Sequence, residues 1–173
     1  MKRMSAREIS LGGMIAALYV VLTYAANALG LASGAVQVRF SEALTILPVF
    51  TTAAIPGLSV GCLLANLASP FGAIDWITGT FATLSGALLT WALRKIRFKN
   101  VPYLAPLPPV ITNSILVGWM LAYTMPEGFS FAAFAIAALE VGIGEFIVCY
   151  ALGLPLAMLI EKNRPLKSIL SLN

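Results

Sequence analysis

Long uncharged apolar runs, separated by short basic clusters, divide this 173-residue sequence from end to end. The first run, Ile9 to Gly30, contains no charged residue and is long enough to cross a bilayer, which takes about 20 apolar residues. Because this run has full membrane length, we expect it to be retained and not cleaved as a signal peptide. Only 10% of the residues are charged, against about 25% in a soluble domain. The sequence therefore predicts an integral membrane protein.

Proline and glycine predict where the helices break. Residues 43–74 carry no charge, but Pro48 and the sequence Ile55-Pro56-Gly57 interrupt them, and such residues end helices. Each of the two resulting helices covers about 20 Å, less than the roughly 30 Å hydrocarbon core, so a re-entrant pair is an alternative to two short spans. We predict an all-α integral membrane protein, one domain over 1–173, with a six-helix bundle at about 9–30, 42–54, 56–69, 75–93, 103–123 and 131–160.

The basic residues predict the orientation. Of the 11, three precede the first run, four follow the fourth predicted helix and three lie in the final tail. Only Arg39 falls outside these clusters, close to Glu42 and between two uncharged runs. The positive-inside rule then places both termini in the cytoplasm. Arg39 and Glu42 mark either a surface loop or a recognition element folded over a membrane-embedded site.

Two carboxylates lie inside the last predicted helix, Glu140 and Glu145. A carboxylate at the centre of a span costs about 3 kcal/mol and is usually retained for a partner, an ion or a substrate. Their spacing of five places them about 140° apart around a helix, so both cannot point at one atom. By helical rise, Glu145 and Asn113 fall at a similar depth in the outward half of the bundle.

The other polar and aromatic residues in these runs also have purely structural interpretations. Asp75 could cap the fourth helix, and Trp76 and Trp119 could belong to an interfacial aromatic belt. Asn66 and Asn113 could bridge neighbouring helices by hydrogen bonds.

The sequence lacks the motifs of an enzyme or an ATPase. It contains no histidine, no GxxxxGK[ST] phosphate-binding loop and no pair suited to nucleophilic catalysis. We therefore expect a non-catalytic protein without a metal or cofactor of its own, which captures a small polar solute. Transport would be powered by partners or by a gradient. Two alternatives remain open: a self-sufficient proton-coupled transporter that uses Glu140 or Glu145, and a membrane scaffold without transport.

Several motifs together resemble the QueT family of queuosine-precursor transporters. They are Val36–Pro48 (VQVRFSEALTILP), Ala54–Gly57 (AIPG), Gly61–Asn66 (GCLLAN), Asp75-Trp76, and the Glu-x4-Glu pair of the last helix. Members of this family are substrate-binding (S) components of energy-coupling factor (ECF) transporters. The resemblance implies a six-helix S component in a prokaryotic cell membrane. It would bind a 7-deazaguanine such as preQ1, preQ0 or queuine near the outer surface; an S component for a different vitamin is the alternative.

The resemblance also implies partners. The chain would dock on one transmembrane coupling subunit and two ATPases, which bind ATP and Mg²⁺, and would topple in the membrane to release its ligand. The first predicted helix contains two small-xxx-small pairs, Gly12/Ala16 and Gly13/Ala17. From the sequence alone, such pairs indicate close packing between helices within the bundle. The resemblance instead implies that these four residues contact the coupling subunit. It also assigns Arg39 and Glu42 to a lid over the ligand or to its hinge.

The chemistry of a guanine-like ring suggests roles for these residues. Its N–H and NH2 donors fit a carboxylate in a bidentate manner, so we expect Glu145 and Asn113 to read this edge. Glu140 or Asp75 would meet the exocyclic substituent, and an aromatic side chain would stack on the ring. The predicted substrate-binding residues are Arg39, Phe40, Glu42, Asn66, Asp75, Trp76, Asn113, Trp119, Glu140 and Glu145.

Overall fold

Helices make up nearly all of the regular structure in the computed structural model, which describes residues 4–31, 36–99 and 101–171. Within these ranges a single isolated β-bridge, between Phe98 and Val101, stands beside the helices. In chain order the elements are α1 (Ala6–Ala28), the 3₁₀ helix η1 (Phe40–Val49), α2 (Ala54–Asn66), α3 (Ala73–Leu93), α4 (Leu107–Tyr123), α5 (Phe131–Val148), the π-helical segment η2 (Cys149–Gly153), α6 (Leu154–Lys162) and α7 (Arg164–Leu170).

Three helical segments are long and apolar enough to cross a membrane: α1, α3 and the continuous segment Phe131–Lys162, which joins α5, η2 and α6. The apolar helices η1, α2 and α4 are shorter. The prediction of an all-helical membrane protein with short second and third helices is therefore confirmed. The predicted count of six was wrong, because the described residues form seven α-helices. The π segment divides the last predicted helix, and α7 follows it after Asn163.

The predicted helix 42–54 is a 3₁₀ helix of 10 residues, much longer than most such helices. Two features oppose an α-helix here. Pro48 has no N–H to donate to a preceding carbonyl. The Thr45 hydroxyl instead donates to the Glu42 carbonyl at 2.6 Å, and such side-chain bonds compete with the backbone pattern. Residues 41–49 are all buried, so η1 lies within the bundle and not on its surface.

The predicted fifth helix begins at Leu107 and not at residue 103. The preceding segment contains Pro102 and Pro106, and its backbone forms successive turns. Pro108 and Pro109 lie in the first turn of α4, where a missing N–H has no intrahelical partner to lose.

Close contact between α1 and α2 depends on glycine. A Cβ added at Gly57 would lie 2.6 Å from the Gly12 carbonyl oxygen. One added at Gly61 would lie 2.8 Å from the Tyr19 Cβ and 3.0 Å from the Ala16 backbone. The two helices therefore pack backbone to backbone along this stripe, as small-residue motifs allow.

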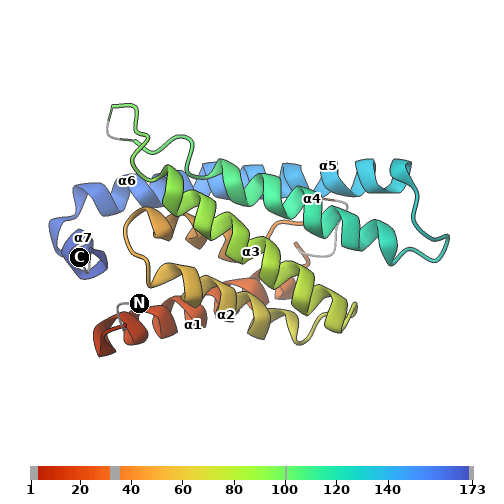
Figure 1. Ribbon diagram of the computed structural model, residues 1–173, viewed down its shortest axis with the longest axis horizontal. Coiled ribbons are helices and arrows are strands. Elements are labelled where there is room, and N and C mark those ends of the chain that lie inside the picture. Colours follow the sequence, from red (N-terminus) through yellow and green to blue (C-terminus); the bar gives the residue numbers. More distant parts are fainter. Residues whose placement is uncertain (1–3, 32–35, 100, 172–173) are drawn as a thin grey trace.

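The path of the chain separates the two ends of the bundle. Successive passes run in alternating directions along its long axis, so the start of α1, the loop after α3 and helix α7 lie at one end (Figure 1). We call this the terminal end. The α2–α3 and α4–α5 connections lie at the other, which we call the loop end. Leu170 of α7 is buried in the same hydrophobic cluster as Leu11 and Ile15 of α1, so α7 closes the core at the terminal end.

Candidate functional site

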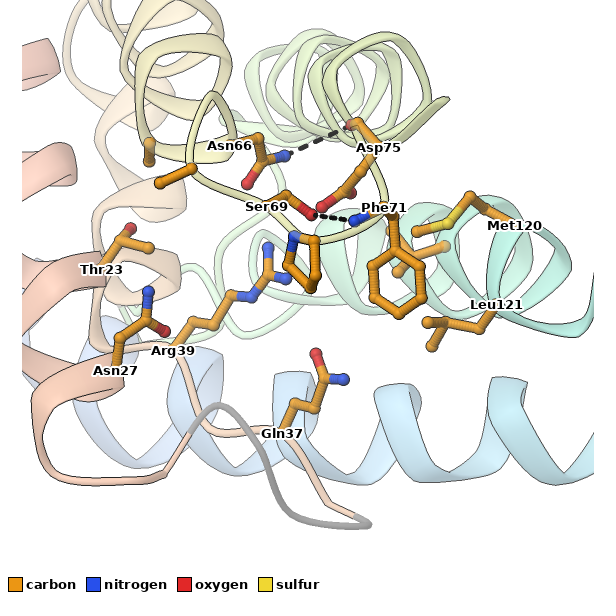
Figure 2. Close-up of a pocket in the computed structure, with 14 residues that line it drawn as sticks. Thr23, Asn27, Gln37, Arg39, Asn66, Ser69, Phe71, Asp75, Met120 and Leu121 are labelled. Carbon is orange, nitrogen blue, oxygen red and sulfur yellow. Dashed lines mark hydrogen bonds between the residues drawn. The ribbon is translucent and has the colours of Figure 1, made fainter. Parts of the chain in front are cut away.

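A cavity of about 420 Å³ opens at the loop end of the bundle. We call it the outer cavity. Its walls come from the last turns of α1, the turn between α2 and α3, the C-terminal half of α4, and the segment before η1 (Figure 2). Its polar lining consists of Thr23, Asn27, Gln37, Arg39, Asn66, Ser69 and Asp75. A volume of this size is typical of a small-molecule site.

A much smaller space of about 20 Å³ lies deeper in the bundle. We call it the inner pocket. It shares Gln37, Arg39 and Val117 with the outer cavity, so these residues separate the two spaces. Its further polar lining consists of Tyr19, Glu42, Cys62, Thr83, Asn113 and Glu145. The inner pocket has room for about one water molecule.

Glu42 presents one free carboxylate oxygen in the inner pocket. Its side chain is 3% exposed, and the Tyr19 hydroxyl donates a hydrogen bond to Oε1. Oε2 is buried and accepts no hydrogen bond from the described residues. A buried acceptor without a donor is costly, so this oxygen is suited to receive a hydrogen bond from a ligand. Glu42 is buried in η1 within the bundle, so its place in a lid or in the hinge of a lid stays a prediction.

Asn113 and Glu145 lie side by side in the inner pocket, on α4 and α5. Both are buried. The Asn113 side chain faces the Glu145 carboxylate, but its amide nitrogen forms no hydrogen bond of normal geometry within the described part of the chain. The Cys149 thiol lies 3.7 Å from Glu145 Oε2. The inner pocket therefore combines carboxylate acceptors with an amide donor.

Asp75 supplies a third carboxylate, in the wall of the outer cavity. It is 2% exposed, and its Oδ1 accepts no hydrogen bond from any described residue. Asn66 donates to the Asp75 backbone carbonyl at 3.4 Å, which ties the end of α2 to the start of α3 (Figure 2). Gly72, not Asp75, is the N-cap of α3.

Among the described residues, Arg39 is the one cation that lines the two spaces, against the carboxylates of Glu42, Asp75 and Glu145. Its side chain extends into the outer cavity, toward the side where Ser69 and Asp75 lie (Figure 2). No ion pair or hydrogen bond holds its guanidinium among the described residues. The lining therefore combines three carboxyl groups with one guanidinium. The predicted lid belongs to the loop after the first predicted helix, and residues 32–35 of that loop lie outside the described residues.

Glycine also positions the segment that carries Gln37 and Arg39. A Cβ at Gly144 of α5 would overlap the Gln37 carbonyl oxygen. This segment can therefore cross close against α5 only because residue 144 has no side chain.

The structure does not bring all of the predicted residues to these spaces. Trp119 is 44% exposed and stacks on Tyr123, with ring centroids 5.4 Å apart. Phe40 and Trp76 are half-buried and line neither the outer cavity nor the inner pocket. Phe71, which the sequence analysis missed, is the aromatic residue of the outer cavity.

Glu140 lies apart from Glu145. It is half-buried and lines a neighbouring cavity of about 300 Å³. That cavity shares Gln37, Phe71 and Leu121 with the outer cavity. The two glutamates of the last long helix therefore face different spaces, and Glu140 belongs to the approach to the outer cavity.

Sequence reasoning also missed the polar face of α1. Tyr19, Thr23 and Asn27 follow one another at intervals of four, which places them on one face of a helix. Thr23 donates to the Ser41 hydroxyl at 2.8 Å and so joins α1 to η1. The spacing of four between these polar residues could have indicated this face from the sequence, because it continues the face of the helix that carries Gly12 and Ala16.

The four small residues of α1 fall into two groups. Gly12 and Ala16 are buried against α2. Gly13 and Ala17 are exposed, and a Cβ at Gly13 would meet nothing within 4 Å. In this structure only the second pair is available to another protein.

Apolar helices that can cross a membrane and that enclose a polar cavity define a multi-pass membrane protein. The sequence model of the QueT transporter family matches residues 9–162, so the chain belongs to this family. This confirms the family predicted from the sequence motifs.

One curated relative is the "Queuosine precursor transporter QueT" of Lactococcus lactis subsp. cremoris (strain MG1363). It is 33% identical over 84 residues, and the matched stretch spans 49% of this chain and 49% of the relative. The match thus spans about half the length of that protein. No solved structure matches the chain.

Proposed function

We propose that this protein is the substrate-binding membrane subunit of an importer for a queuosine precursor, a 7-deazaguanine. The observation that carries the proposal is the group of unpartnered buried atoms around the inner pocket and outer cavity: Glu42 Oε2, Asp75 Oδ1 and Asn113 Nδ2. The family supports a transport role, and the name of the Lactococcus relative supports this substrate class.

The inner pocket suits the hydrogen-bonding edge of a guanine-like ring. That edge has N–H and NH2 donors beside a carbonyl acceptor, and a carboxylate can accept both donors at once. Glu145 or Glu42 would accept the donors, and the Asn113 amide would donate to the carbonyl. Phe71 of the outer cavity would cover a face of the ring, a contact worth about 1–3 kcal/mol in other nucleobase sites.

The charge of the lining favours a cationic substituent. Three carboxylates face one guanidinium across the two spaces, and a nearby opposite charge stabilises a cation. The aminomethyl group of preQ1 is cationic at neutral pH, whereas the nitrile of preQ0 is neutral. Asp75 is the carboxylate that lines the outer cavity among the described residues, so we assign it to this ammonium group and expect preQ1 to bind more tightly than preQ0.

The dimensions of the two spaces define what must move. An inner pocket of about 20 Å³ cannot admit a bicyclic ring, whereas the outer cavity of about 420 Å³ can. Arg39 lines both spaces. The ring would therefore enter the outer cavity first, and its polar edge would reach Glu145 and Asn113 once the Arg39 side chain moves aside.

Transport would be driven by partners of the ECF type: a transmembrane coupling subunit and two ATPases that bind ATP and Mg²⁺. The exposed pair Gly13 and Ala17 would contact the coupling subunit by close helix packing. Every described cation except Arg39 belongs to a segment at the terminal end. By the positive-inside rule this end is cytoplasmic, so the outer cavity opens to the outside and toppling would release the ligand inward.

A thermal-shift screen of the purified protein tests the substrate class. We expect preQ1, and less strongly preQ0 and queuine, to raise the unfolding temperature. A ligand at 100 times its dissociation constant adds about 2.7 kcal/mol to the free energy of unfolding. Guanine and unrelated vitamins serve as controls. Stabilisation by a vitamin alone, without any effect of the deazaguanines, would overturn the proposed substrate.

Reconstituted transport tests the coupling. In proteoliposomes, preQ1 uptake should require the partner subunits and ATP. Uptake by this chain alone under a pH gradient would instead assign Glu140 or Glu145 to proton coupling.

A further inference from the structure

A second polar cavity, of about 490 Å³, lies at the terminal end, far from the outer cavity. We call it the basic cavity. It lies between the loop after α3 and the segment formed by α6 and α7. Four cations line it together with one carboxylate: Arg97, Lys99, Lys162, Lys167 and Glu161. The transport site described above uses none of these residues.

Glu161 holds two of these cations in place. Its carboxylate accepts from Arg97 and from Lys167, and the Glu161 side chain is only 18% exposed. Arg97 lies 64 residues before Glu161 in the sequence. Lys99 and Lys162 form no ion pair within the described part of the chain. The cavity therefore has an excess of three positive charges over its single carboxylate.

The basic cavity lies where two candidate spans end, α3 at Leu93 and the last long segment at Lys162. This is the level of lipid headgroups if both segments cross the membrane. The loop beside it carries exposed apolar side chains: Ile96, Phe98 and Tyr103 are 51%, 66% and 46% exposed. Exposed aromatic residues next to cations are typical of the membrane interface.

We propose that the basic cavity binds the phosphate-bearing headgroup of an anionic phospholipid. Orientation in the membrane requires only that cations lie on one side. It does not require a loop and a distant helix to converge on one carboxylate around a cavity. A phosphate diester offers oxygen acceptors that match the ammonium donors of Lys99 and Lys162, and the Lys99 ammonium lies 5.6 Å from the centroid of the Phe98 ring. The exposed side chains of Ile96 and Phe98 would contact the acyl chains, which inorganic phosphate lacks.

Thermal unfolding in a neutral detergent tests this site. Short-chain phosphatidylglycerol should stabilise the protein in a saturable manner, whereas phosphatidylcholine with the same acyl chains and inorganic phosphate should not. Equal stabilisation by the two lipids would overturn the proposal. If the natural occupant of the basic cavity is a protein partner, the isolated chain should show no selectivity between the lipids, and that result would also overturn it. Saturation by inorganic phosphate at the same concentration would assign the site to a free anion and overturn the lipid assignment.

A matched pair of variants separates the site from general charge. The double variant Lys99→Gln/Lys162→Gln removes two lining cations that form no ion pair. The control Lys95→Gln/Arg164→Gln removes the same charge from the same end of the bundle, at positions outside the cavity. The first should weaken phosphatidylglycerol binding by about 25-fold, given the usual contribution of a lysine near an anionic surface. The control should change it less than about threefold. Equal losses in both would refute the site.

Discussion

At the residue scale, the two oxygens of Glu42 have different roles. The Tyr19 hydroxyl holds Oε1, while Oε2 faces the inner pocket without a donor from the described residues. A buried carboxylate that lost its remaining donor would be strongly destabilising. Tyr19 therefore orients Glu42 and leaves the second oxygen available to the ligand.

Tyr19→Phe should lower both stability and ligand affinity. A hydrogen bond to a charged group contributes about 1.5–3 kcal/mol, so we expect the free energy of unfolding to fall by about this amount. Thermal unfolding and equilibrium binding of preQ1 measure the two effects. Tyr24→Phe is the control, since Tyr24 is exposed on the same helix. Equal behaviour of the two variants would show that Tyr19 does not orient Glu42.

Arg39→Gln tests how charge sets selectivity. Arg39 is the only cation of the described residues that lines the two spaces. Its removal makes the site more negative, which favours a cationic ligand over a neutral one. The ratio of preQ1 affinity to preQ0 affinity should therefore rise at least about tenfold, because one such charge contributes several kcal/mol at short range. Calorimetric titration of both ligands measures the ratio. A ratio that stays constant or falls would contradict this electrostatic account.

At the scale of elements, the contact between α1 and α2 supports one wall of the site. It places Tyr19 of α1 against Gly61 of α2, so the position of the Tyr19–Glu42 pair depends on two glycines. A side chain at Gly57 or Gly61 would separate the helices and displace Tyr19.

Gly57→Leu should destabilise the protein by at least about 2 kcal/mol, because a Cβ there already meets a backbone oxygen that cannot yield. Thermal unfolding in detergent provides the measurement. Gly13→Leu is the matched control on the open side of α1 and should leave stability and ligand binding unchanged. In co-purification with the coupling subunit, Gly13→Leu should reduce complex formation if Gly13 and Ala17 form the docking surface. A neutral Gly57→Leu would show that the helices do not depend on this contact.

The elements also show how far sequence reasoning extends. Apolar runs and prolines predicted the helices within a few residues, because the bilayer and the missing N–H of proline act locally. The 3₁₀ form of η1 and the π segment η2 were not predicted, since they depend on packing among distant segments. Helical rise predicted the shared depth of Asn113 and Glu145.

Other parts of the candidate site could not be predicted in the same way. Tyr19 resembles a core aromatic in an apolar run, and only the pairing with Glu42 gives its hydroxyl a role. Trp119 was assigned by residue type and by its depth along the helix, whereas its direction around α4 is fixed by the packing of α4 on its neighbours. That packing leaves it facing outward.

At the scale of the whole molecule, the two ends differ in charge. Carboxylates gather around the outer cavity and inner pocket, and cations gather at the terminal end. The proposed orientation places the carboxylate-rich end outside, where the solute is captured.

Cysteine labelling in intact cells tests this orientation. Glu127→Cys, in the α4–α5 connection, should react with a membrane-impermeant maleimide. Lys95→Cys, at the terminal end, should react only after the cells are permeabilised. Both native cysteines are buried, so background labelling should be low. Labelling of position 95 and protection of position 127 in intact cells would reverse the orientation.

Equilibrium binding of preQ1 to the purified protein and to two glutamate variants tests the central claim most directly. Both glutamates lie on α5, but Glu145 lines the inner pocket and Glu140 lines the neighbouring cavity. Glu145→Gln and Glu140→Gln each remove one carboxylate, so the two variants are matched in charge. We expect tight binding by the unmutated protein, a loss of about tenfold to a hundredfold in Glu145→Gln, and a change below about threefold in Glu140→Gln. Absence of preQ1 binding to the unmutated protein, or equal losses in the two variants, would contradict the account.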